Sequence, residues 1–192
     1  MQKMNIIARN VTVTMCRDTL AGIPAHALPL GYRIRSYAPG DEHEWVRIES
    51  AADQFNAISV ELFRTEFGDN PARLAERQLY LLDGPGTIIG TATAWFDNAH
   101  RGQPYGRIHW VAIHPDFQGQ GLSKPLLTSA CRRLYELGHG KAYLVTSSAR
   151  INAINLYAQF GFRTEIQGAQ DEAVWEELRG HLRNFPGQSP QG

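Results

Sequence analysis

Two spacings of hydrophobic residues recur along the chain and divide it into expected strands and helices. Apolar stretches that alternate with polar residues or run continuously, and that end at turn-forming residues, predict strands. They cover residues 10–16, 32–37, 79–82, 88–96, 107–114 and 142–146, and a further strand begins at residue 162. Apolar residues spaced three and four positions apart predict helices. They cover residues 42–52, 59–67, 71–76, 123–137, 154–160 and 172–182.

The order of these elements favours an α/β (α+β) protein. The strands at 79–82 and 88–96 flank the turn Asp83–Gly86, and two apolar strands joined by a tight turn predict an antiparallel hairpin. Asp41 precedes the helix at 42–52 and is expected to cap its first turn. Further along the chain, strands and helices alternate. We therefore expect a mixed, mainly antiparallel central sheet that is flanked by helices.

Residues 1–31 are expected to be an N-terminal extension of the folded domain, which would comprise residues 32–185. Within the extension, residues 11–16 alternate between apolar and polar side chains and predict one strand. Prolines and a glycine predict a loop between this strand and the domain. The polar end of the chain, residues 186–192, is expected to be a flexible tail.

Composition and charge exclude several classes of protein. Of 192 residues, 43% are hydrophobic and 20% are charged, which is ordinary for a globular protein with a full core. The 19 basic and 19 acidic residues leave no net charge, whereas a nucleic-acid-binding domain usually carries a basic surplus. No apolar run reaches the roughly 18–20 residues that cross a membrane, and the N-terminus lacks the apolar core of a signal peptide. Cys16 and Cys131 are too few for a disulfide scaffold and lack metal-ligand spacing. We therefore expect a cytoplasmic protein that binds no nucleic acid, membrane or metal ion.

A glycine-containing loop between an expected strand and an expected helix is the most informative segment. It reads Gln118-Gly119-Gln120-Gly121. A strand, a glycine loop and a helix N-terminus together form a site at which backbone N–H groups and the helix dipole bind phosphate. The spacing fits neither a dinucleotide-binding fingerprint nor a Walker loop, because the third glycine and the Gly-Lys-Ser/Thr sequence are missing. A tight entry into the helix is the alternative interpretation of the two glycines.

Two segments of the chain resemble the Gcn5-related N-acetyltransferase (GNAT) family. The first is Gln118-Gly119-Gln120-Gly121-Leu122-Ser123, which is similar to the family signature Gln/Arg-x-x-Gly-x-Gly/Ala, with Ser123 at the last position. The second is residues 150–162, which resemble the family's Asn-x-x-Ala-x-x-Leu-Tyr-x-x-x-Gly-Phe segment, with Arg150 in place of the first asparagine. The resemblance covers roughly residues 32–165. It implies a sheet in which two strands, here 109–113 and 142–146, splay apart.

The resemblance also implies acetyl-CoA, or another acyl-CoA, as the co-substrate. The backbone of the strand before the loop would pair with its pantetheine arm, in the manner of an added strand. Backbone N–H groups from Gly119 to Lys124 would hold its pyrophosphate, and no metal ion is needed. Asn152 or Asn155 would substitute for the asparagine that Arg150 replaces. The residues implied as cofactor contacts are therefore Val111, Ile113, Gln118, Gly119, Gln120, Gly121, Leu122, Ser123, Lys124, Asn152 and Asn155.

Tyr157 is the candidate general acid. It falls at the tyrosine of the second family segment, which implies that it protonates the departing CoA thiolate. A core tyrosine next to Leu156 and Phe160 is the alternative.

His109 is the best local candidate for the base that takes the ammonium proton, because the pKa of histidine suits work near neutral pH. The alternation of the strand places it on one face with Val111 and Ile113. The segment is also similar to the corresponding strand of serotonin N-acetyltransferase, in which a histidine at the matching position takes part in proton removal. A structural or solvent-facing histidine is the alternative, with Glu61 or Glu66 acting through water in its place.

These observations predict an acyl-CoA-dependent N-acyltransferase that transfers acetyl directly to an amine, without a covalent enzyme intermediate. The acceptor stays open between a small molecule and a peptide, and a homodimer is expected by analogy with the family. Two other functions remain as alternatives. One is a non-catalytic module that binds or senses acyl-CoA. The other is a nucleotide-binding regulator, which the missing Lys-Ser/Thr pair disfavours.

The last part of the chain departs from the family pattern. A sheet of this family usually ends with a seventh strand paired to the sixth, but residues 173–178 have the pattern of a helix. The extra strand at residues 11–16 would take the vacant place, either within the chain or across a dimer.

Overall fold

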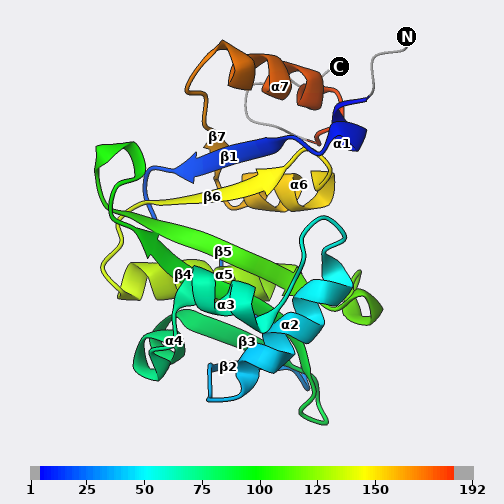
Figure 1. The fold of residues 1–192 in the computed structure, drawn as a ribbon, viewed down its shortest axis with the longest axis vertical. Coiled ribbons are helices and arrows are strands. Elements are labelled where there is room, and N and C mark those ends of the chain that lie inside the picture. Colours follow the sequence, from blue (N-terminus) through cyan, green and yellow to red (C-terminus); the bar gives the residue numbers. More distant parts are fainter. Residues whose placement is uncertain (1–4, 184–192) are drawn as a thin grey trace. The chain divides into compact units, whose positions relative to one another are not determined.

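The computed structural model describes residues 5–183, and the chain forms two compact units. Among the described residues, the first unit comprises residues 5–19 and 140–183, and the second comprises residues 20–139. Figure 1 shows the helices and strands of both. The tail expected at residues 186–192 lies outside the described residues.

The unit of residues 20–139 is built on an antiparallel sheet with the strand order β2-β3-β4-β5. The Asp83 carboxylate accepts hydrogen bonds from the backbone N–H groups of Gly86 and Thr87, which closes the turn between β3 and β4. The predicted hairpin is thereby confirmed. The strands are β2 (Arg33–Ser36), β3 (Gln78–Leu82), β4 (Ile88–Asp97) and β5 (Tyr105–Ile113).

Helices cover both faces of this sheet, with α2 and α3 in front of it and α5 behind it (Figure 1). Two short helices are capped by side chains that accept backbone hydrogen bonds: Ser59 from Leu62 N–H, and Asn70 from Arg73 N–H. The helices of the unit are α2 (Asp41–Ala52), α3 (Val60–Phe67), α4 (Pro71–Arg77) and α5 (Ser123–Glu136), with the 3-10 helices η1 (His100–Gly102) and η2 (Pro115–Phe117).

The core in front of the sheet is aromatic. Trp45 on α2 contacts Phe63 and Phe67 on α3 edge to face, with ring centroids 5.4 and 5.8 Å apart. It also contacts Trp110 on β5 at 5.2 Å. Fully burying one such side chain contributes about 1.5–3 kcal/mol relative to leaving it exposed. Because Trp45 is fully buried, this cluster fixes α2 and α3 against β5.

A β-bulge in β5 separates His109 from Ile113. Thr93 on β4 lies opposite His109 and Gly90 lies opposite Ile113, so three steps along β4 match four steps along β5. Trp110 lies within this irregular stretch, with a φ of 47°. Side chains alternate along a regular strand, so the extra residue moves His109 and Ile113 to opposite faces. The expectation that one face carries both residues is therefore wrong, because hydrophobic alternation contains no signal for the bulge.

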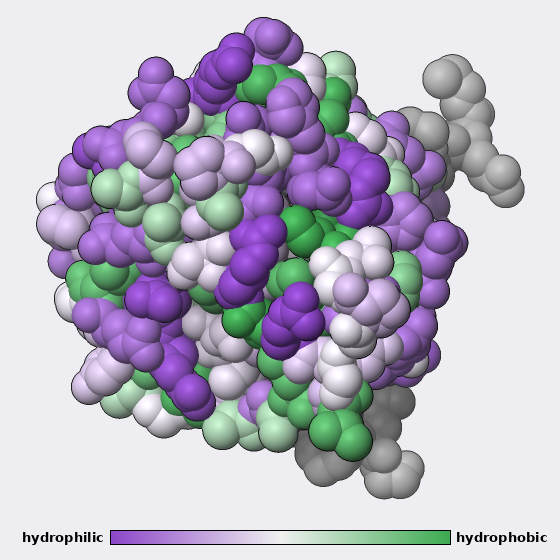
Figure 2. Space-filling model, turned by 90° about the horizontal axis from the view of Figure 1, so that it is seen from below, coloured by the Kyte–Doolittle hydropathy of each residue, from purple (hydrophilic) through white to green (hydrophobic). Residues whose placement is uncertain are grey.

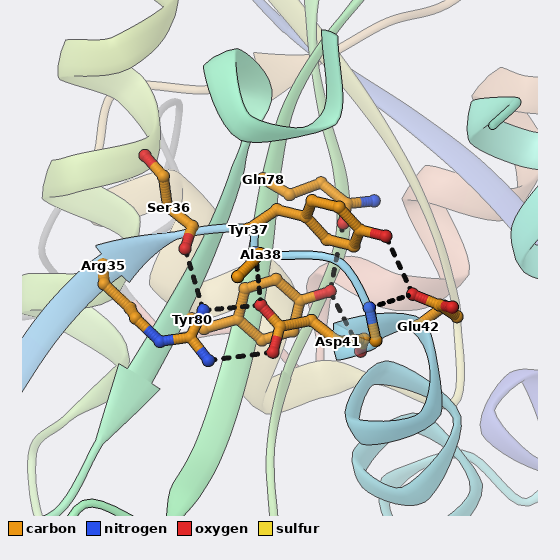
Figure 3. Close-up of polar contacts among 9 residues, drawn as sticks. Arg35, Ser36, Tyr37, Ala38, Asp41, Glu42, Gln78 and Tyr80 are labelled. Atoms are coloured by element: carbon orange, nitrogen blue, oxygen red, sulfur yellow. Dashed lines mark hydrogen bonds and ion pairs between the residues drawn. The ribbon is translucent and has the colours of Figure 1, made fainter. Parts of the chain in front are cut away.

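An ion pair with a buried carboxylate holds the start of α2 against β2 (Figure 3). The Asp41 carboxylate, with the residue 7% exposed, accepts hydrogen bonds from both terminal nitrogens of Arg35 and from Ala38 N–H at 2.6 Å. Asp41 is the first residue of α2, and Gly40 occupies the capping position without a side-chain cap. The expectation that Asp41 caps this helix is therefore wrong, because its carboxylate turns back to Arg35 on the neighbouring strand.

Two tyrosines extend this network (Figure 3). Tyr37 donates to the Glu42 carboxylate at 2.8 Å, and Tyr80 donates to the side-chain oxygen of Gln78 at 3.0 Å. Burial, followed by the hydrogen bond to Glu42, raises the pKa of Tyr37 to about 12. Burial also raises the pKa of Tyr80. Both phenols therefore stay protonated near neutral pH and serve as hydrogen-bond donors.

In the other unit the strands pair antiparallel in the order β6-β1-β7. Strand β1 pairs with β6 along its whole length and with β7 on its other edge. The N-terminal strand thus lies beside the sixth strand within one chain, which is one of the two arrangements expected from the sequence. The elements of this unit are α1 (Ile6–Arg9), β1 (Thr12–Arg17), β6 (Ala142–Ser147), α6 (Ile151–Gln159), β7 (Arg163–Thr164) and α7 (Ala169–Arg179).

The expected fold class is confirmed: helices flank strands whose pairings within each unit are all antiparallel. Three helices differ most from expectation. Helix α6 begins at Ile151 and α7 begins at Ala169, each three residues early, and α1 is too short to show a helical period. The first residues of α6 and α7 include polar side chains, so the spacing of apolar residues does not indicate these first turns. The domain boundaries and the splay between strands 109–113 and 142–146 stay predictions.

The face drawn in Figure 2 is mostly hydrophilic, with hydrophobic residues in small separate groups. None of the helices among residues 5–183 is long and apolar enough to cross a membrane. Cys16 and Cys131 are both buried and form no disulfide.

Candidate functional site

The loop before α5 leads into an open helix N-terminus. Helix α5 has 14 residues, and no side chain caps it at Leu122. Pro125 has no N–H group, and Leu126 N–H donates to the Leu122 carbonyl at 3.2 Å. The N–H groups of Ser123 and Lys124 therefore precede this bond and point outward at the positive end of the helix dipole. Such an end attracts a negatively charged group.

Gly119 and Gly121 give this loop its shape. Their φ angles are 75° and 76°, in the left-handed region that other residues rarely adopt. A Cβ atom built on either glycine would meet nothing within 4 Å. The backbone conformation therefore requires glycine at both positions, and the space beside the two residues is open. The open space favours a ligand-binding loop over a mere entry into the helix.

Three side chains of the motif are used within the protein. Gln118 Nε2 donates to the Ile113 carbonyl at 2.9 Å, which ties the loop to the end of β5. Gln120 Oε1 accepts from the Tyr32 hydroxyl at 2.9 Å. Leu122 is buried in the core. This segment would therefore contact a cofactor mainly through its backbone. The spacing of the motif does not show whether backbone or side chains make such contacts.

His109 on β5 is paired with Glu66 on α3. His109 Nε2 lies 2.6 Å from Glu66 Oε2, and the two side chains are 10% and 28% exposed. The rings of Phe67 and Trp110 contact the imidazole, with centroids 5.6 and 6.0 Å away. The aromatic cluster that fixes α3 therefore also sets the position of this pair.

The surroundings favour a neutral histidine and an ionised carboxylate. Burial lowers the pKa of His109, the hydrogen bond to Glu66 opposes this change, and Arg107 adds to it, so that the pKa stays below its ordinary value. The hydrogen bond from His109 holds the pKa of Glu66 below its ordinary value. Near neutral pH, Nε2 therefore carries a hydrogen that it donates to Glu66, and Nδ1 carries a lone pair. Such a ring can accept a proton.

The sequence predicts Glu66 only as an alternative to His109, together with Glu61, which is exposed on α3. The approach of α3 to β5 brings together two residues that lie 43 positions apart. One local signal pointed to Glu66: it directly precedes Phe67, at the edge of the apolar face of α3. Periodicity alone does not say which strand such a carboxylate meets.

The remaining residues of β5 and the following turn lie as follows. His114 precedes η2 as its N-cap, and its Nδ1 accepts from Asp116 N–H at 3.4 Å, so it is a turn residue. Val111 is partly exposed beside the bulge, and Ile113 is buried. Backbone pairing of these two residues with pantetheine stays a prediction.

The other expected site residues belong to the unit that contains α6. Tyr157 is 8% exposed, and its ring centroid lies 6.2 Å from that of Phe162. Asn155 Oδ1 accepts from Arg183 N–H at 2.7 Å, and Asn152 is exposed. Their roles as general acid and cofactor contacts stay predictions.

Comparison with known families agrees with the geometry of the loop. The model of the acetyltransferase (GNAT) family matches residues 42–162, which include the loop, His109 and Tyr157. The chain belongs to the GNAT acetyltransferase family. The resemblance found in the two sequence segments is therefore confirmed.

Two relatives of this GNAT chain are mycothiol acetyltransferases. That of Pseudarthrobacter chlorophenolicus is 30% identical over 150 residues, which cover 74% of this chain and 46% of the relative. That of Arthrobacter sp. (strain FB24) is 29% identical over 150 residues, with the same two coverages of 74% and 46%. The chain thus spans about half the length of these curated relatives.

A solved structure shares the fold. The crystal structure of a GCN5-related N-acetyltransferase from Sphaerobacter thermophilus matches with a TM-score of 0.67 and 23% identity, covering 82% of this chain and 50% of that one. At this identity the likeness shows the GNAT fold alone.

Enzymes of the GNAT family use acetyl-CoA, and the loop before α5 fits its diphosphate. Two outward N–H groups, the positive end of the α5 dipole and open space beside two glycines suit an anion that approaches the backbone closely. Within residues 5–183, no group of three or more His, Cys, Asp or Glu side chains could hold a metal ion.

Proposed function

We propose that the protein is an acetyl-CoA-dependent N-acetyltransferase that acts on a small-molecule amine. The observation that carries the proposal is the pair of His109 and Glu66. A module that only binds acyl-CoA, or a regulator that only binds a nucleotide, needs no partly buried histidine held in its unprotonated form. A GNAT enzyme needs such a base, because an amine attacks only after it has lost the ammonium proton.

The co-substrate would bind along one continuous strand–loop–helix segment. Backbone N–H groups from Gly119 to Lys124 hold the diphosphate, and the backbone of Val111 and Ile113 pairs with the pantetheine arm. Gln118 keeps the loop in place through its bond to the Ile113 carbonyl. Asn152 and Asn155 are the proposed contacts from α6.

The chemistry is a direct transfer between the amine and the thioester. Nδ1 of His109 takes the ammonium proton, and the free amine attacks the acetyl carbon. A C–N bond forms, the C–S bond breaks, and the CoA thiolate receives a proton from the Tyr157 hydroxyl. The second proton, which the nitrogen loses as the amide forms, restores the Tyr157 hydroxyl. A thiolate is already a good leaving group, so Tyr157 contributes less to the rate than the base does.

The names of the relatives support this class of acceptor. Both are named mycothiol acetyltransferases, which favours a small-molecule amine of the mycothiol type over a peptide. Since this chain spans about half of those proteins, the class of acceptor is proposed and not a single compound. A cytoplasmic location and a homodimer stay expectations from the sequence and the family.

The test is thiol release from acetyl-CoA in the presence of a panel of small-molecule amines and short peptides. We expect release that depends on a small-molecule amine, with an equal amount of N-acetylated product by mass spectrometry. Tyr157→Phe should retain acetyl-CoA binding and lower kcat by about 10- to 100-fold. Binding of acetyl-CoA without amine-dependent release in any reaction would instead support a non-catalytic acyl-CoA-binding module.

A further inference from the structure

The contact between Glu66 and His109 joins α3 to β5, and neither segment of the GNAT motif contains Glu66. We infer that Glu66 is a positioning residue, which binds Nε2–H of His109 and so directs the Nδ1 lone pair toward the acceptor amine. The inference rests on the proposed function, in which His109 takes the ammonium proton.

The hydrogen bond at Nε2 determines both the tautomer and the orientation of the imidazole. A neutral imidazole has one N–H donor and one lone pair, and either nitrogen can carry the hydrogen. With the hydrogen on Nε2 and bound to Glu66, Nδ1 has the lone pair. A half-turn of the ring about the Cβ–Cγ bond would move Nε2 away from the carboxylate and break the 2.6 Å contact. Glu66 therefore selects one tautomer and one ring orientation.

The core holds the carboxylate at this place. Glu66 lies in the last turn of α3, and Gly68 ends the helix with its N–H donating to the Arg64 carbonyl at 2.8 Å. The next residue, Phe67, is 2% exposed and packs on both Trp45 and the imidazole of His109. The aromatic cluster therefore holds the backbone of Glu66 beside His109.

The charge of Glu66 matters as well as its position. When His109 takes a proton, a positive charge forms on a side chain that is 10% exposed, and the adjacent carboxylate stabilises it. Two charged groups act on His109 among the described residues: Glu66 from α3 and Arg107 from β5, with opposite effects on its pKa. Thr93, which lies opposite on β4, is uncharged. With an amide in place of Glu66, no negative charge would oppose the effect of Arg107, which lowers the pKa of His109.

The experiment compares Glu66→Gln, Glu66→Asp and His109→Gln with the wild-type protein. Glu44→Gln is the matched control, since Glu44 lies 2.6 Å from Arg47 in an exposed ion pair on α2. Two quantities are measured for each variant. The first is kcat/KM as a function of pH with the amine found in the panel. The second is the pKa of His109, followed by NMR on protein labelled with ¹⁵N-histidine.

For Glu66→Gln we expect kcat/KM to fall by about 10- to 100-fold, which is the contribution of one charge-assisted hydrogen bond. Loss of the negative charge lowers the pKa of His109, so the acidic limb of the profile moves to lower pH. Glu66→Asp keeps the charge and should retain more of the wild-type limb than Glu66→Gln, while the shorter side chain lowers kcat. Glu44→Gln should match the wild type in both measurements, and thermal unfolding checks that each variant is folded.

Each other outcome overturns a defined part of the inference. An unchanged pKa of His109 in Glu66→Gln would show that Glu66 does not act through the histidine. Wild-type kcat/KM in His109→Gln, together with a loss in Glu66→Gln, would make Glu66 itself the base. The titration of His109 requires no turnover. Absence of amine-dependent activity in the wild type would therefore overturn the proposed function alone, while the NMR result still decides whether Glu66 controls His109.

Discussion

The hydroxyl of Tyr32 donates a 2.9 Å hydrogen bond to Oε1 of Gln120, across 88 positions of the chain. Gln120 stands between the two glycines of the loop before α5, so this bond joins the segment before β2 to the proposed diphosphate site. The hydrogen bond is exposed to solvent, so the contact restrains the loop more than it stabilises the core.

Tyr32→Phe removes this bond and keeps the aromatic ring. A net hydrogen bond contributes about 0.5–1.5 kcal/mol. We therefore expect the KM for acetyl-CoA to rise about two- to tenfold with kcat unchanged, measured from initial rates over a range of acetyl-CoA concentrations. Tyr135→Phe, at an exposed tyrosine on α5, is the matched control. A change in kcat without a change in KM would show that Tyr32 acts in a step other than acetyl-CoA binding.

The pH dependence of the wild-type enzyme should reflect His109. A base works in its deprotonated form, so kcat/KM should rise with pH through the pKa of His109 in the free enzyme. Burial, only partly opposed by Glu66, lowers that pKa, so the midpoint should lie below the ordinary histidine value of 6.5. A midpoint above that value, or a profile without an acidic limb, would contradict the assignment of His109.

The ion pair between Arg35 and Asp41 should matter for stability and not for catalysis. Asp41→Asn removes the negative charge and leaves the Arg35 guanidinium without its carboxylate partner. We expect the free energy of unfolding to fall by about 2 kcal/mol, measured by urea denaturation. Glu136→Gln, in an exposed ion pair with Arg133 on α5, should change it by less than about 0.5 kcal/mol. Equal effects of the two variants would show that burial does not strengthen the Arg35–Asp41 pair.

The N-terminal strand should be essential to the unit that contains β6. Ser148 is buried, accepts from Val11 N–H at 2.8 Å and donates to the Ile6 carbonyl at 2.6 Å. Ser148→Ala leaves both backbone groups without this partner and should cost about 1–3 kcal/mol. Deleting residues 1–20 removes the middle strand of β6-β1-β7 and should lower the melting temperature sharply. Ser129→Ala on α5 is the control, and an unchanged melting temperature in the deletion would exclude a structural role for β1.

Hydrophobic period and turn residues were sufficient to predict nearly all helices and strands, because each element buries one face. They also located the glycine loop, whose backbone angles only glycine adopts readily. The sequence left open whether the N-terminal strand pairs within the chain or across a dimer. Its pairing with β6 depends on contacts between residues far apart in the chain, such as Thr12 and Ser147.

The site was predictable only in part. His109 could be chosen because its side chain has a suitable pKa, but its partner could not. Glu66 meets it through helix-to-sheet packing, and the bulge at Trp110 changes which residues of β5 share its face. Neither feature alters the spacing of apolar residues, so a reading of periodicity misses both. Asp41 is a further example of a contact that the sequence does not reveal. Its carboxylate binds Arg35 on the neighbouring strand and does not cap the helix.

Calorimetric titration with CoA is the most direct test of the claim that the amides before α5 bind its diphosphate. Gly121→Ala adds a Cβ in the open space and strains a φ of 76°, whereas Gly138→Ala imposes a similar strain at a φ of 83° at the other end of α5. We expect CoA to bind the wild type and Gly138→Ala with similar affinity and Gly121→Ala at least tenfold more weakly, about 1.4 kcal/mol. No binding of CoA to the wild type, or equal affinity in all three proteins, would contradict the account.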